Sequence, residues 1–155
     1  MLIVHVLLSL VGILTGLVVA RGMLRSDRMP RWTDAFLATT VLTSVTGFFL
    51  PATKFLPSHA TGILSLVILA VTLYAWYGKK LAGSWRWIYV ATAIAALYLN
   101  VFVGVVQAFL KIESLKALAP QQNEPPFIAA QAVVLLAFVA LGVLAAKRFR
   151  PAPSA

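Results

Sequence analysis

The sequence has no cysteine and very few acidic residues. Without cysteine, the chain has no disulfide, no thiolate metal ligand and no cysteine nucleophile. Only four Asp and Glu stand against thirteen Lys and Arg, which gives a formal net charge of +9. The four acids are scattered, so no two carboxylates have a spacing that would support general acid–base catalysis. The HExxH, Walker A and GxGxxG patterns are also absent, and the sequence therefore does not favour an enzyme.

Charge of either sign is scarce, and apolar residues take its place. Charged residues make up 11% of the chain and hydrophobic residues 61%, with a mean hydropathy of +0.94. Soluble domains have roughly 25% charged residues, so this composition predicts an integral membrane protein with one transmembrane domain over residues 1–155. The basic residues fall in short clusters between apolar runs. This pattern predicts the lipid bilayer as the partner and excludes a nucleic-acid-binding face.

Five long apolar runs predict an all-α, polytopic membrane helix bundle. A helix needs about 20 apolar residues to cross a hydrocarbon core of about 30 Å. The runs cover approximately residues 2–20, 32–50, 60–77, 87–110 and 127–146. Threonine and serine dilute the second run. We still expect it to span, because hydroxyl groups can bond to carbonyls of their own helix and so tolerate lipid depth.

The basic residues are divided unequally between the two sides of this predicted bundle. Ten follow the first, third and fifth runs: Arg21, Arg25, Arg28, Arg31, Lys79, Lys80, Arg86, Lys147, Arg148 and Arg150. Only Lys54, Lys111 and Lys116 lie on the other side. The positive-inside rule therefore predicts a cytoplasmic C-terminus and an N-terminus outside.

Two amides interrupt the fourth run, which is otherwise strongly apolar. At 100° per residue, Asn100 and Gln107 share one helix face with Gly104 and Lys111. An unpaired amide is costly in hydrocarbon, so this face is predicted to look into the bundle.

Similar polar faces occur on other runs. The first run has one with His5, Ser9 and a GxxxG formed by Gly12 and Gly16, a pattern that permits close helix approach. Gln131 begins another on the fifth run. A threonine strip on the second run is expected to serve packing.

The predicted topology brings the uncharged polar groups to the outer half of the bundle. Contacts between helices alone would have no reason to concentrate in one leaflet, so this clustering predicts a binding pocket that faces outward. The predicted lining residues are His5, Asn100, Gln107 and Gln131. Lys54, Lys111 and Glu124 are expected at its rim.

Three functions remain open from these residues. The first is a non-catalytic protein whose pocket binds a small or lipid-like molecule for transport, sensing or assembly. The second is electron transfer, with His5 and His59 as axial ligands of a b-type haem or as hydrogen-bond donors to a quinone. The third is an accessory or scaffold subunit, or a homo-oligomer, in which the polar faces only join helices.

The segments AGSWRWIYVATA, ALYLNVFVGVVQAFLK and LAPQQNEPPF resemble a group of small, uncharacterised bacterial inner-membrane proteins. The resemblance covers residues 82–127, and TSVTGFFLP is a looser match. It implies a multi-pass protein of a bacterial inner membrane and no particular activity. One departure lies in the last segment, where the group's pattern is closer to APTQSEPPF and this chain has Gln121, Gln122 and Asn123.

Overall fold

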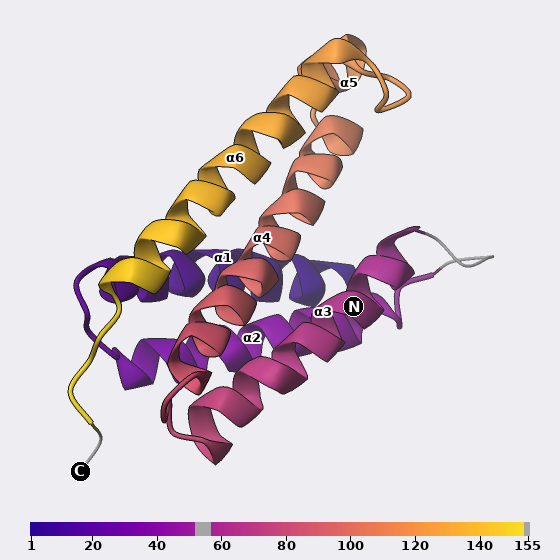
Figure 1. Cartoon of the computed structure of the whole chain (residues 1–155). Coiled ribbons are helices and arrows are strands. Elements are labelled where there is room, and N and C mark those ends of the chain that lie inside the picture. The colour runs from indigo at the N-terminus through magenta and orange to yellow at the C-terminus, as the bar shows by residue number, and fades with distance from the viewer. Residues whose placement is uncertain (52–56, 154–155) are drawn as a thin grey trace.

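The protein is an all-helical bundle in a computed structural model that describes residues 1–51 and 57–153 (Figure 1). No strand occurs within these ranges. In chain order the helices are α1 (Leu2–Leu24), α2 (Pro30–Gly47), α3 (Pro57–Leu73), the π-helical turn η1 (Tyr74–Gly78), α4 (Trp85–Lys111), α5 (Glu113–Leu118) and α6 (Pro125–Arg148).

All five predicted runs are helical, and four helices are long and apolar enough to cross a membrane. These four are α1, the continuous segment Ser58–Gly78, α4 and α6. The four long apolar helices indicate a membrane protein. By length and composition α2 is not among them, because its 18 residues include Pro30, Arg31 and Asp34 as well as several hydroxyl side chains, all of which lower its hydropathy.

One end of the bundle is held together by contacts between loops that are far apart in the sequence. The Arg28 guanidinium donates to the Lys80 carbonyl over 3.2 Å, which joins the α1–α2 loop to the η1–α4 loop. The Arg150 N–H donates to Ser26 Oγ over 2.8 Å, so the segment after α6 reaches the same place. We call this the basic end, because the loops with most of the cationic residues meet here.

The hydrophobic core lies in the half of the bundle next to the basic end. Its centre is Tyr89, which is 1% exposed and stacks on Trp76 at a ring-centroid distance of 5.1 Å. Phe149 packs against the same ring, and Thr33 Oγ1 lies 3.4 Å from the Tyr89 hydroxyl. Because α2, η1, α4 and the segment after α6 all contribute to this cluster, the bundle is tightly packed at this end.

The helices separate toward the opposite end, which we call the α5 end. Residues 101–108 of α4 are all only half-buried, and Ala145 is the one buried residue of α6. Figure 1 shows α4 and α6 running side by side toward α5, at an angle to the α1–α2 pair. At this end α4 borders a cavity together with α1, α2 and α3.

The GxxxG of α1 lies where three helices come closest. A Cβ added at Gly16 would be 2.5 Å from Leu97 Cδ1 and 2.9 Å from the Phe36 ring. At Gly12 it would be 3.0 Å from Asn100 Nδ2 and 3.3 Å from Thr40 Oγ1. The two glycines therefore let α1 approach both α2 and α4, as the sequence predicts.

Candidate functional site

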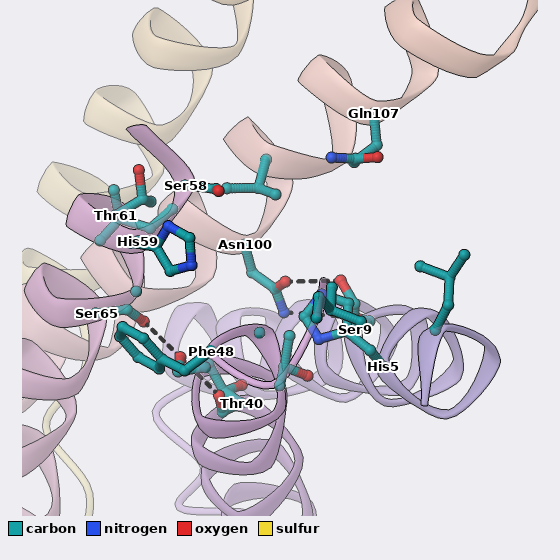
Figure 2. Close-up of a pocket in the computed structure, with 18 of the residues that line it drawn as sticks. His5, Ser9, Thr40, Phe48, Ser58, His59, Thr61, Ser65, Asn100 and Gln107 are labelled. Atoms are coloured by element: carbon teal, nitrogen blue, oxygen red, sulfur yellow. Dashed lines mark hydrogen bonds between the residues drawn. The ribbon is translucent and has the colours of Figure 1, made fainter. Parts of the chain in front are cut away.

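A cavity of about 530 Å³ occupies the space at the α5 end (Figure 2). Helices α1, α2, α3 and α4 all contribute to its wall. The polar lining residues are His5, Ser9, Thr40, Thr43, Ser44, Ser58, His59, Thr61, Ser65, Asn100, Gln107 and Lys111. The apolar part of the wall includes Leu2, Phe48, Leu50, Leu99 and Val103. The cavity is therefore amphipathic and large enough for a small organic molecule.

The structure brings together five of the residues singled out in the sequence. His5 of α1, His59 of α3, and Asn100, Gln107 and Lys111 of α4 all line the cavity. Three separate helices thus supply polar groups at one end of the bundle.

Asn100 joins two helices at the floor of the cavity. Its Oδ1 accepts a hydrogen bond from Ser9 Oγ over 2.9 Å, and its Nδ2 lies 3.4 Å from the Ser9 carbonyl. The side chain is only 8% exposed. Asn100 is therefore both an interhelical contact and part of the wall, because the same amide is bonded to α1 and borders the cavity.

His5 is oriented by the end of α2. Its Nδ1 lies 3.0 Å from Thr46 Oγ1, while Gly47 leaves room beside the imidazole. With Nδ1 occupied, Nε2 is the nitrogen left for other partners.

A group of hydroxyls on α2 and α3 forms the wall opposite α4. Ser44 Oγ and Ser65 Oγ form a hydrogen bond over 3.2 Å that joins the two helices. Thr43 Oγ1 donates to the Thr39 carbonyl of its own helix. The threonines of α2, which the sequence predicts to serve packing, thus also line the cavity, and Thr61 and Ser65 of α3 are lining residues that were not predicted. The signal for α3 was present, since Ser58, Thr61 and Ser65 recur at helical spacing.

Gln107 and Lys111 occupy the open side of the cavity. Figure 2 shows the Gln107 amide on α4, set apart from the Ser9–Asn100 bond. Among the described residues, no hydrogen-bond partner is found for this amide, and Lys111 is exposed. No carboxylate belongs to the described lining. The site can therefore donate hydrogen bonds to a ligand, and the ammonium group of Lys111 places one positive charge beside it.

Gln131 lies outside the cavity, because α6 packs on another side of α4. Its Nε2 donates to the Phe102 carbonyl over 3.2 Å. Its Oε1 is buried, with no partner in the part of the chain that the structure describes. The expectation that Gln131 shares a chamber with His5, Asn100 and Gln107 is therefore not met by this arrangement. Lys54, another expected rim residue, lies outside the described residues.

Glu124 also lies apart from the cavity, where it organises the loop before α6. Its carboxylate oxygens accept hydrogen bonds of 3.1 Å from the N–H groups of Gln121 and Asn123. Desolvation alone would raise the pKa of Glu124, but these and neighbouring backbone N–H groups outweigh it, so the pKa is lowered.

Acidification is expected to remove the contribution of the Glu124 carboxylate to the stability of the folded protein. Because its folded-state pKa is lowered, the stabilisation is fully present above the unfolded-state value of about 4.5 and is lost as pH falls through the lower folded value. Glu124→Gln should therefore reduce the thermal midpoint at pH 7 and have a smaller effect at pH 3. Thermal scans of both proteins at the two pH values measure this, and an equal penalty at both would contradict the assignment.

No protein-family model, curated protein or solved structure matches the chain.

Proposed function

We propose that the protein is a non-catalytic membrane protein whose cavity binds a small or lipid-like molecule. The observation behind this proposal is the cavity of about 530 Å³, in which polar groups from separate helices face a common space. Helix-to-helix contacts alone would be expected to close such a space, because packed interfaces leave few voids larger than a water molecule.

The character of the wall favours an amphiphile. Its polar groups include His5, Asn100 and Gln107, and Leu99 and Val103 provide apolar surface on α4. A ligand with a hydrogen-bonding head and an apolar body would satisfy both parts. Binding of such a molecule from the bilayer would serve transport, sensing or assembly.

We further propose that α2 also spans a bacterial inner membrane, which makes five spans. The hydroxyls of Thr39, Thr40, Thr43, Ser44 and Thr46 each donate to the carbonyl four residues earlier, so the helix satisfies these groups internally. If α2 spans, the loops at the basic end share one side of the membrane, and the positive-inside rule assigns that side to the cytoplasm. The N-terminus and the cavity then face outward.

Ligand retention by two matched variants tests the binding proposal. Gln107→Leu removes an amide that lines the cavity, and Gln131→Leu makes the same change on α6 outside it. The proteins are purified in mild detergent, and bound molecules are extracted and quantified by mass spectrometry. Gln107→Leu should reduce the occupancy by about threefold to tenfold, because a net hydrogen bond contributes about 0.5–1.5 kcal/mol.

The control separates binding from stability. Gln131→Leu should keep the wild-type occupancy, and thermal scans establish that both variants are folded. Two outcomes would contradict a ligand in this cavity. One is wild-type ligand occupancy in both Gln107→Leu and Asn100→Leu, and the other is an equal loss of ligand in these variants and in Gln131→Leu.

Electron transfer is the second candidate, since His5 and His59 line the same cavity. His5 is held through Nδ1, which donates to Thr46 Oγ1 because the Thr46 hydroxyl proton goes to the Leu42 carbonyl. The Nε2 lone pair of neutral His5 would then suit a haem iron, whereas a quinone carbonyl would need the protonated imidazole, which donates from both nitrogens. A visible spectrum of protein from haem-sufficient cells tests the haem version. A featureless spectrum excludes it, and a quinone in the extracted material would support the other version.

A scaffold subunit is the third candidate, and the Ser9–Asn100 bond is the kind of contact it requires. The open cavity counts against it as the whole explanation. A stable larger complex in which a partner fills this space would favour it.

A further inference from the structure

We propose a second binding site, at the basic end, that holds the phosphate of an anionic phospholipid head group. A hollow of about 390 Å³ lies between the η1–α4 loop and the segment after α6. Its lining comprises Arg28, Lys79, Lys80, Leu81, Ala82, Gly83, Arg86, Pro151, Ala152 and Pro153. Four cationic side chains therefore surround one concave space. None of these residues belongs to the cavity at the α5 end.

Contacts with neighbouring groups hold three of the four cations in place. The Arg28 guanidinium lies 5.5 Å from the centre of the Trp76 ring while it donates to the Lys80 carbonyl. Arg86 donates to the Phe149 carbonyl. Lys79 Nζ lies 5.6 Å from the centre of the Tyr74 ring. The positions of these charges are set before a ligand arrives, which lowers the ordering cost of binding.

The acids at this end do not neutralise the hollow. Asp27 Oδ1 accepts a hydrogen bond from the Met29 N–H over 3.1 Å, and Asp34 accepts one from the Tyr77 hydroxyl. No carboxylate is part of the described lining. Four like charges around one space repel one another, and an anion placed among them would relieve that repulsion. Phosphate fits this role, because Arg and Lys are the usual phosphate-binding residues.

The position of the hollow favours a lipid as the source of the phosphate. It lies beside the end of the candidate span Ser58–Gly78 and the start of α4. Tyr77 and Trp87, which flank it in sequence, are each 53% exposed. Exposed Tyr and Trp at helix ends are typical of the membrane–water interface, where lipid phosphates lie. Basic pockets between membrane helices at this level bind anionic head groups.

Lipid binding by two charge-matched variants tests the proposal. Lys79→Gln/Lys80→Gln removes two charges from the hollow, and Lys147→Gln/Arg148→Gln removes two exposed charges of the same end that do not line it. Each protein is titrated in a neutral detergent with phosphatidylglycerol or with zwitterionic phosphatidylcholine, and bound lipid is counted by native mass spectrometry. The wild type should prefer phosphatidylglycerol.

The two charge-removing variants should differ in their affinity for phosphatidylglycerol. The hollow variant should bind phosphatidylglycerol about tenfold more weakly or worse, because it loses two of the four cations that line the proposed phosphate site. The control should remain within about twofold. Equal losses in the two variants, or no preference for phosphatidylglycerol, would overturn the proposal. Thermal scans check folding, and Lys80→Gln alone, which leaves the Lys79 ring contact intact, should show part of the same loss.

Competition with a soluble head group distinguishes the two sources of phosphate. Glycerol phosphate at concentrations similar to the lipid should leave binding unchanged, because it lacks the acyl chains that hold the lipid beside the helices. Complete displacement by glycerol phosphate would overturn the lipid assignment in favour of a soluble anion.

Discussion

Gly16→Ala is expected to destabilise the protein by about 1–3 kcal/mol, although it adds a single methyl group. The new Cβ would lie 2.5 Å from Leu97 Cδ1 and 2.9 Å from the Phe36 ring. Both neighbours are only 1% exposed and belong to the hydrophobic core, so neither can move into free space. The methyl group therefore forces α1 away from α2 and α4. Denaturant unfolding in detergent, followed by tryptophan fluorescence, measures the loss.

Gly104→Ala is the matched control for this effect. The nearest side-chain atom to the added Cβ is Ile13 Cδ1 at 3.7 Å, an ordinary contact distance. Alanine is the better helix former by about 1 kcal/mol, so this variant should be neutral or slightly more stable. If both glycine variants lost the same stability, the close approach at Gly16 would not be the cause.

Val103→Trp is expected to abolish ligand retention while the fold is preserved. Val103 is half-buried on α4 and lines the cavity. An indole at this position would occupy space that the ligand needs, and occupancy should fall by about tenfold or more, as expected when a binding site is blocked by a bulky side chain. Overpacking normally costs about 1–3 kcal/mol, but here the added atoms enter a cavity and not a filled core.

Val133→Trp provides the same substitution on the outside of α6. Val133 is 66% exposed, so the indole should alter neither the cavity nor the packing. Mass spectrometry of extracted ligand and a thermal scan are made on both variants. Wild-type occupancy in Val103→Trp would show that the retained molecule binds elsewhere and would remove the main support for the proposed function.

Local periodicity was sufficient to predict the helices and the polar face of α4. The runs around residues 2–20 and 127–146 extend in the structure to α1 and α6, which end a few residues later at Leu24 and Arg148. The face shared by Asn100 and Gln107 does border an internal space, because an amide is costly in hydrocarbon. The close approach at Gly12 and Gly16 was predictable from the same kind of local pattern.

The residues that line the cavity were only partly predictable from the sequence. Gln131 and Asn100 are similar amides in similar apolar runs, yet one bonds to the Phe102 carbonyl and the other lines the cavity. Helical spacing shows which residues share a face of one helix. It does not show which neighbour that face meets, so Gln131 could not be separated from the lining residues.

By itself, the sequence determined a helical, strongly apolar and basic chain with amides on selected helix faces. These properties follow from composition and from a period of 3.6 residues, both of which are local. Only the tertiary structure decided that α4 has α1, α2 and α3 around the cavity on one side and α6 on another, and that the helices diverge at the α5 end. Interhelical angles depend on contacts among distant residues, such as Tyr89 with Phe149 and Gly16 with Leu97, and these contacts arise only when the whole bundle is packed.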